Sequence, residues 1–292
     1  MYPKYSCRFS IFIICLYLYI NNNSLFYKMT DHIITGEKYQ LDCDYFIGEP
    51  KYFDKNPRIK SCDDSRKVNI HSSTFPKVDK FVKIFCYTHI LTHNFKKLFD
   101  LLNTVETTFI LYFHNSDGPF ERGYQKLFEL PNLEKIYTQN INCEPNEKLI
   151  PIGIGIANSM WPHGNLKIWE SVLKKPIEKS NFIYCFFNIG TCKSKRSYCH
   201  NIIKDKGIPI QKKSNYNSYL NLLRTFKYAI CPEGNGLDTH RFWECVYLDV
   251  VPICLKNHIT EYFSKQYPVI LLDKWEDLDI DNIDKCISIP EK

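Results

Sequence analysis

The stretch FKYAICPEGNGLDTHRFWECVYLDVVPIC, which runs from Phe226 to Cys254, decides the fold predicted for this chain. Its apolar residues at 228–230 predict a short strand, and the polar, glycine-containing segment at 232–236 predicts a turn. An amphipathic helix is predicted to begin at 238–239, and a second apolar strand to follow at 250–254. A strand, turn, helix and strand in this order form the unit from which parallel sheets with covering helices are built.

The turn of this unit carries residues suited to an anion. It lies at the carboxyl end of a strand, where open α/β sheets bind ligands, and its glycines let the backbone come close to one. The helix N-terminus offers N–H groups and partial positive charge. Arg241 presents a fork of donors to a phosphate, and Glu244 on the same face could accept hydrogen bonds from ribose hydroxyls. The sequence predicts a pocket for a nucleoside diphosphate, comprising Glu233, Gly234, Asn235, Gly236, Asp238, Arg241 and Glu244. The alternative is an ordinary loop followed by a surface pair of Arg241 and Glu244.

The same stretch resembles the donor-binding half of exostosin-like glycosyltransferases and, more loosely, that of the α1,3-fucosyltransferases. The residues that carry the resemblance are Pro232, Glu233, Arg241, Glu244, Val251 and Pro252. The resemblance is strong over 181–275, whereas residues 30–165 are only compatible with it. The resemblance implies two Rossmann-like domains facing across a cleft, the GT-B architecture, and transfer of a sugar from a nucleotide-sugar donor to a hydroxyl group.

A second basic residue follows from the same resemblance. A predicted strand at 182–187 leads into a polar loop and a helix over about 195–203. In the fucosyltransferase donor domain an arginine in this position binds the donor phosphates, and Arg196 is the residue that matches. Lys193 and Lys195 lie beside it. The alternative is a solvated basic loop.

Composition limits the class of protein. With 292 residues, 44% of them hydrophobic, the chain can bury a large core and has room for two domains. The net charge of +6 comes from dispersed lysines and arginines, so nucleic acid is not predicted as a partner, and a small anionic ligand fits better. The 13 cysteines form no Cys-x-x-Cys pair, and several lie in apolar segments, which favours reduced thiols over a disulfide framework.

The N-terminus leaves three interpretations open. Residues 9–20 form an apolar run of about 12 residues, which is too short to span a bilayer as an ordinary helix. The run is compatible with a signal or membrane anchor, with an extension upstream of a true start at Met29, or with a structural strand. The sequence is therefore compatible with membrane association through this run and also with a cytoplasmic location.

The sequence of the first half of the chain predicts a second parallel sheet and a catalytic base. Strands are expected at 45–47, 82–86, 109–113, 135–137 and 149–152, with helices at 94–102 and 123–130 and irregular loop over 49–80. His114 and Asp117 follow the third of these strands, and either could remove the proton from an attacking hydroxyl. The alternative is that they shape a turn.

A glycine-rich segment, PIGIGIANSMWPHGN, covers 151–165 and predicts an ordered loop between the two halves. Asn158 and His163 are its candidates for contact with donor or acceptor in the cleft. A lone histidine in a loop is also compatible with a structural role.

No metal site is predicted. The Asp-x-Asp patterns at 42–44, 277–279 and 279–281 resemble the metal-binding pattern of one glycosyltransferase class. Two of them lie in an acidic tail predicted over 275–281, and the third precedes the first predicted strand, so chance explains them better. Two arginines and a helix N-terminus could stabilise the departing diphosphate instead. The predicted activity is therefore independent of metal, and the nucleotide sugar is a substrate and not a cofactor.

The sequence thus predicts an N-terminal extension over 1–28, an acceptor-side domain over 29–165 and a nucleotide-sugar-binding domain over 166–292. The predicted partners are a nucleotide-sugar donor and a hydroxyl of a glycan or protein. Inversion or retention of configuration stays open. The alternatives are a non-catalytic nucleotide-sugar or carbohydrate-binding protein, and an enzyme such as an epimerase that acts on the donor without an acceptor.

Overall fold

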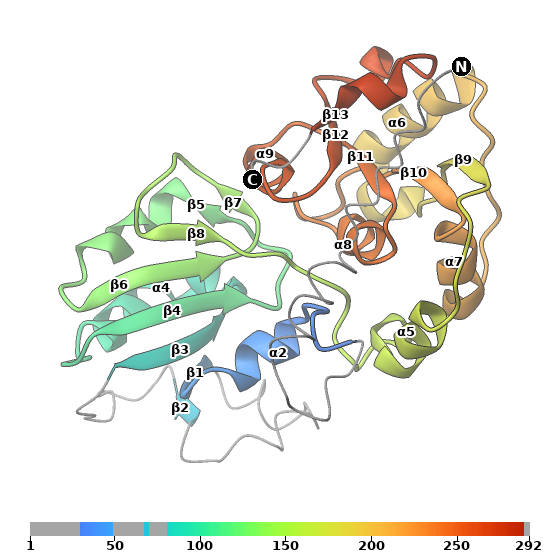
Figure 1. The fold of residues 1–292 in the computed structure, drawn as a ribbon. Helices are drawn as coiled ribbons and strands as arrows, with labels where there is room; N and C mark the ends of the chain where they lie inside the picture. The colour runs from blue at the N-terminus through green and yellow to red at the C-terminus, as the bar shows by residue number, and fades with distance from the viewer. Residues whose placement is uncertain (1–29, 49–66, 70–80, 289–292) are drawn as a thin grey trace.

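The structure is a computed structural model that describes residues 30–48, 67–69 and 81–288. It is an α/β protein with two sheets built mainly from parallel strands, and this arrangement is consistent with two Rossmann-like domains (Figure 1). The predicted α/β class is confirmed. The apolar run at 9–20 lies outside the described residues, and no helix among the described residues is long and apolar enough to cross a membrane.

The first sheet has the strand order β2-β1-β3-β4-β6-β8, and all its neighbouring strands are parallel. A small parallel pair, β5 with β7, lies beside it. The strands predicted for this half are all present. The prediction of an irregular loop over 49–80 is wrong for residues 67–69, because they form β2 at the edge of the sheet. The strands are β1 (Tyr45–Gly48), β2 (Lys67–Asn69), β3 (Val82–Tyr87), β4 (Phe109–His114), β5 (Phe120–Glu121), β6 (Leu133–Thr138), β7 (Ile141–Asn142) and β8 (Leu149–Pro151).

Three helical segments cover this sheet. Helix α2 (Gly36–Leu41) packs on β4, α4 (His89–Leu102) packs on β3, and the 3-10 helix η3 (Arg122–Glu129) contacts α4 and β6. The helix predicted at 94–102 begins earlier, at His89, and kinks at Asn94 (φ −139°, ψ 27°), where it was expected to start. The helix predicted at 123–130 is present as a 3-10 helix.

The second sheet has the order β13-β12-β11-β10-β9, with β9 to β12 parallel and β13 antiparallel. Its strands are β9 (Asn181–Tyr184), β10 (Phe226–Ile230), β11 (Val251–Leu255), β12 (Val269–Leu272) and β13 (Ile287–Ser288). The strand predicted at 182–187 ends at Tyr184, and the chain then leaves the sheet. The strands predicted at 228–230 and 250–254 are confirmed.

Helices cover both faces of the second sheet. Alternate side chains of β10 point to opposite faces: Tyr228 and Ile230 join the cluster with Cys199 and Ile203 of α6, whereas Ala229 joins the cluster with α7, α8 and α9. Helices α5 and α7 were not predicted. The helices of this half are α5 (Leu166–Leu173), α6 (Lys193–Asp205), α7 (Tyr216–Leu223), α8 (His240–Tyr247) and α9 (His258–Ser264), with the 3-10 segments η4 (Pro162–Gly164), η5 (Ile189–Cys192), η6 (Trp275–Asp277) and η7 (Ile283–Cys286).

The acidic end of the chain is part of the fold. The sequence predicts an acidic tail from Trp275 to Asp281, but Trp275 is 2% exposed and Leu278 is 3% exposed, and both belong to the apolar cluster under α6. The prediction of a tail is wrong because two apolar side chains dock this segment on the second sheet.

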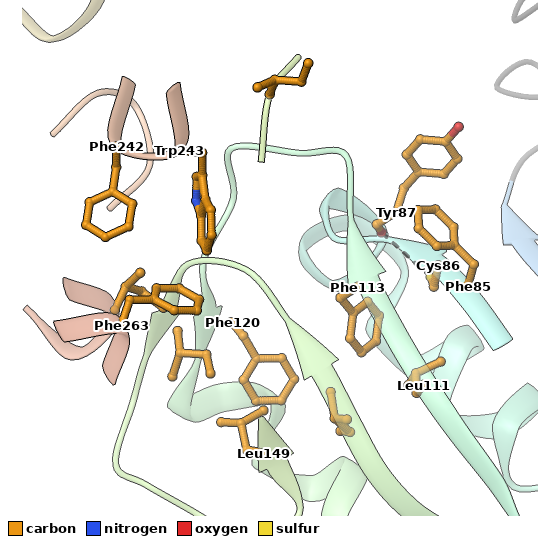
Figure 2. Packing of buried hydrophobic residues seen from close by; sticks show 14 of the residues in the cluster. Phe85, Cys86, Tyr87, Leu111, Phe113, Phe120, Leu149, Phe242, Trp243 and Phe263 are labelled. Atoms are coloured by element: carbon orange, nitrogen blue, oxygen red, sulfur yellow. Dashed lines mark hydrogen bonds between the residues drawn. The ribbon is translucent and has the colours of Figure 1, made fainter. Parts of the chain in front are cut away.

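One apolar cluster joins the two halves. It runs from the strands of the first sheet to helices α8 and α9 of the second half. Figure 2 shows Trp243 and Phe263 beside Phe120 and Leu149, which come from the first half. The rings of Trp243 and Phe263 meet edge to face, with centroids 4.8 Å apart. Among the described residues ten cysteines are free and none forms a disulfide, in line with the reduced thiols predicted.

Candidate functional site

The candidate site lies at the carboxyl ends of β9 and β10, where the chain turns into α6 and α8. Thr239 caps α8 by accepting a hydrogen bond from the backbone N–H of Phe242, and the helix begins at His240. The turn at 232–236 therefore lies between a buried strand and a capped helix, as the sequence predicts. Basic side chains of α6 and α8 reach this edge from the two sides of the turn.

Arg196 and Arg241 hold the same short segment after β9. Arg196 donates from Nη1 to the backbone oxygen of Asn188 (2.9 Å) and from Nε to that of Glu233 (2.8 Å). Arg241 donates from Nη1 to the backbone oxygen of Phe186 (2.8 Å). Burial and the nearby Arg241 guanidinium lower the pKa of Arg196. Two positive groups from separate helices are thus close together, which favours an anion between them.

Arg241 also lies against two neighbouring aromatic rings. Its guanidinium carbon is 4.7 Å from the ring centroid of Tyr219 and 5.2 Å from that of Tyr184. These cation–π contacts hold a planar guanidinium in one orientation. The side chain is therefore placed before any ligand binds.

Glu244 is occupied by protein partners. Its side chain is 8% exposed; Tyr216 donates to Oε1 (3.0 Å), Tyr219 donates to Oε2, and Arg241 Nε lies 3.4 Å from Oε2. Sequence analysis predicts that this carboxylate binds ribose hydroxyls, but in the structure both oxygens are engaged. The contacts favour a different role, in which Glu244 positions Arg241.

Glu233 is likewise held in place. Lys195 Nζ forms an ion pair with Oε2, and Asn257 Nδ2 donates to Oε1 (3.0 Å). Because Arg196 binds the backbone oxygen of the same residue, two basic side chains of α6 together tie the turn to this helix, and we call this contact region the unit around Glu233. Gly234 lies against this unit: a Cβ there would come 3.2 Å from Arg196 Nη2.

The rest of the turn touches the first half of the chain. Asn235 and Asp117 are both exposed, and Asn235 Nδ2 donates to Asp117 Oδ2 (3.0 Å). A Cβ on Gly236 would lie 2.5 Å from Asn140 Nδ2, so only glycine allows this close approach. The structure thus brings predicted residues of both halves, Asp117 and Asn235, into one contact.

Asp238 is buried at the junction of the halves. It is 5% exposed and accepts hydrogen bonds from the backbone N–H of Ile154 (2.6 Å) and from Trp243 Nε1 (2.9 Å). Its own N–H donates to Asn140 Oδ1 (2.8 Å). Sequence analysis predicts a donor-binding role for Asp238, whereas these contacts favour a structural role in joining the two halves.

His114 lies below the surface. It is 2% exposed, its Nε2 lies 3.2 Å from the backbone oxygen of Gly153, and its Nδ1 lies 3.1 Å from Asn115 Oδ1. Burial lowers its pKa to about 4. A catalytic base must reach its substrate and bind a proton near neutral pH, so this placement is unfavourable for the role predicted from the sequence.

The candidates of the 151–165 loop lie at two different places. Asn158 accepts a hydrogen bond from the backbone N–H of Glu37 (3.1 Å) and donates to Asn115 Oδ1 (3.0 Å), which ties the loop to the first half. His163 lies next to the site: its ring centroid is 6.1 Å from that of Tyr216 and 6.3 Å from that of His240. Only His163 therefore lies beside the candidate donor pocket.

Sequence analysis missed His240, the first residue of α8. Its Nδ1 lies 2.7 Å from the backbone oxygen of Gly155, in the segment between the halves. The only signal in the sequence is its position, directly before Arg241 and directly after the N-cap. That position alone does not distinguish it from any other histidine at a helix start.

The described residues contain no group of three or more His, Cys, Asp or Glu side chains placed to hold a metal ion. Residues of all three Asp-x-Asp patterns make protein contacts instead. Asp42 pairs with Lys83 Nζ (2.6 Å), Asp44 accepts from the backbone N–H of Lys83 (2.9 Å), and Asp279 caps the turn at Asn282. Independence from metal stays a prediction.

Asp238 and His114 should have opposite effects on the pH dependence of stability. Burial, opposed by hydrogen bonds from Ile154 and Trp243, raises the pKa of Asp238 from 3.8 to about 6, so the native state binds more protons than the unfolded chain between these values. The contribution of Asp238 to the free energy of unfolding therefore falls as the pH rises from about 4 to about 6. Burial lowers the pKa of His114 from 6.5 to about 4, so stability from this group rises with pH over nearly the same window.

We therefore expect Asp238→Asn to make the free energy of unfolding rise more steeply between pH 4 and 6 than it does in the wild type. The difference between the two curves should reach about 1–3 kcal/mol, since one pKa unit corresponds to about 1.4 kcal/mol. Urea unfolding at pH 4, 5, 6 and 7 measures it. Parallel curves for the two proteins would show that Asp238 ionises in the folded state as it does in the unfolded chain.

No protein-family model matches this chain, and no curated protein matches it at a significant level.

Proposed function

We propose that this protein is a glycosyltransferase of the GT-B type, which transfers a sugar from a nucleotide-sugar donor to a hydroxyl of a glycan or protein. In this proposal the domain over 29–165 binds the acceptor and the domain over 166–292 binds the donor, with the two facing across a cleft. One observation supports it most: Arg196 and Arg241, from different helices, converge on residues 186–188 at the carboxyl edge of the second sheet.

The chemistry of donor cleavage fits this convergence. When the bond from the anomeric carbon to the diphosphate breaks, negative charge develops on the leaving phosphate oxygens. Arg196 and Arg241 would stabilise that charge from fixed positions, which is where electrostatic stabilisation is most effective. Glu233, held by Lys195 and Asn257, would contact the sugar or the base of the donor. Glu244 would act through Arg241 and not on the ribose.

Binding of nucleotides tests the proposal. A ligand present at 100 times its Kd stabilises a protein by about 2.7 kcal/mol, so UDP, GDP, CMP and their sugar conjugates should be screened by thermal shift, with and without EDTA. We expect one nucleotide class to raise the melting temperature, and Arg196→Ala to weaken its binding by about 10- to 100-fold, the loss typical of a charge-assisted hydrogen bond.

The matched control is Lys204→Ala, which removes an exposed positive charge from the other end of α6. It should bind the nucleotide as the wild type does. If no nucleotide shifts the wild type, or if both variants lose binding equally, the donor site is not at this edge. A shift that requires a divalent metal would contradict only the metal independence.

The burial of His114 favours a second candidate, a nucleotide-sugar or carbohydrate-binding protein without catalytic activity. Such a protein keeps the donor pocket but has no base at the carboxyl end of β4. Prolonged incubation with the nucleotide sugar that gives the largest thermal shift distinguishes the two. Release of free nucleotide supports the transferase, and an intact donor supports the binding protein.

A further inference from the structure

His240 lies where the two halves of the chain meet. It is the first residue of α8, between Asp238, which is hydrogen-bonded to Ile154 at the junction, and Arg241, which is hydrogen-bonded to Phe186 in the second half. Its own ring contacts Gly155, in the segment that joins the halves. The His240 ring therefore lies at the junction of the halves, on the residue that precedes Arg241 in the chain.

The contact with Gly155 sets the tautomer of the ring. A backbone carbonyl oxygen can only accept, so at 2.7 Å the Nδ1 of His240 must carry the hydrogen and donate it. In the neutral imidazole the remaining nitrogen, Nε2, then carries a lone pair. Nε2 makes no hydrogen bond with the described residues, and it is not one of the buried polar atoms without a partner. The lone pair is therefore available at the surface.

His163 lies between the His240 ring and an exposed aromatic side chain in the chain of ring contacts. The ring centroid of His163 is 6.3 Å from that of His240, and Trp161, which is 53% exposed, stacks on His163 at 6.1 Å. A shallow hollow of about 420 Å³ is lined by Trp161 and by other residues of 159–162 and 165–167. Sugar rings have apolar faces that pack on aromatic rings of this kind, so the surface around Trp161 suits an acceptor sugar.

We propose that His240 is the base of the transfer reaction, an inference that rests on the proposed function. Nε2 of His240 takes the proton of the acceptor hydroxyl as the acceptor oxygen forms its bond to the anomeric carbon. The bond from that carbon to the diphosphate breaks, and its electron pair leaves with the diphosphate, whose charge Arg196 and Arg241 stabilise. Configuration at the anomeric carbon is inverted.

The two bases expected from the sequence are placed less well. His114 has both ring nitrogens within hydrogen-bond distance of protein atoms and is buried. Asp117 is exposed, and one of its oxygens accepts from Asn235. His240 combines a fixed tautomer with an available lone pair, and neither of the others has both.

Charged and titratable groups from each neighbouring element face His240. They are His163, His114 and Asp238, each of which interacts electrostatically with His240. Glu244 lies beyond His163 and beside Arg241. A His163→Ala variant should therefore be assayed beside His240→Ala, so that a loss of activity is assigned to the correct histidine.

The test uses the full chain, nucleotide sugars as donors and a panel of p-nitrophenyl glycosides as acceptors, with release of free nucleotide as the readout. We expect His240→Ala to lower kcat by about 10²- to 10⁴-fold, the usual contribution of a general base, while the thermal shift produced by the nucleotide is unchanged. Added imidazole should restore part of the lost activity. His240→Gln, which keeps a donor for the Gly155 oxygen, should lose activity without losing the fold.

His258→Ala is the matched control, because His258 is also the first residue of a helix after a capping side chain and is exposed. It should keep the wild-type rate. Retention of more than a third of kcat in His240→Ala, or a comparable loss confined to Asp117→Asn, would overturn the inference. A wild type that binds no nucleotide and forms no product contradicts the proposed function itself, which separates the two failures.

Discussion

Replacement of Arg241 with alanine is expected to lower the free energy of unfolding by about 3 kcal/mol. The loss of one partner from a buried ion pair leaves the other charge without compensation, and such losses are typically 3–5 kcal/mol. The lower end applies here because Tyr216 and Tyr219 still donate hydrogen bonds to Glu244. The cation–π contacts with Tyr184 and Tyr219 are lost as well.

Chemical unfolding of a double-mutant cycle measures this effect. If Glu244 is the residue left unpaired, Glu244→Gln in the Arg241→Ala background should recover a large part of the lost stability, because the buried charge is then gone. Lys96→Ala is a control, since it removes an exposed ion pair with Asp100 on α4 and should change stability by less than about 1 kcal/mol. Additive effects of Arg241→Ala and Glu244→Gln would show that the two side chains do not interact.

Replacement of Gly155 with alanine is expected to be at least as destabilising, by more than about 3 kcal/mol. Gly155 has φ +65°, where a residue with a Cβ is less stable by about 1–2 kcal/mol. The added Cβ would also lie 2.1 Å from the backbone oxygen of Ile34, which cannot move without breaking its bond to Ile156. Strain and steric overlap therefore act together at the junction of the halves.

Gly207 offers a matched comparison. It also has a positive φ, +73°, but a Cβ there would meet nothing within 4 Å. Gly207→Ala should therefore lower the free energy of unfolding only by the cost of the backbone strain, about 1–2 kcal/mol. The difference between the two variants, measured by urea unfolding, isolates the overlap with Ile34. Equal losses would show that the contact between the 151–158 segment and Ile34 contributes nothing to stability.

The strands and most helices of this protein could be predicted from the sequence because their signals are local. Apolar runs such as 82–86 and 109–113 become β3 and β4, and Thr239 caps α8 where the sequence places a helix start. Helices α5 and α7 were missed, and β2 lay in a segment rich in charge. A short element that is held by its neighbours has little signal of its own.

The same distinction between local sequence signals and long-range contacts applies to the candidate site. The sequence alone determines that Arg196, Glu233 and Arg241 gather at the carboxyl edge of one sheet, because parallel strands end together. It does not determine what each side chain binds. Glu244 is occupied by tyrosines of α7, 25 and 28 residues away, and His240 is oriented by Gly155, 85 residues away. The tyrosines lie on another helix of the second half and Gly155 lies in the segment between the halves, so the tertiary structure decides which polar groups are paired and which remain open to a ligand.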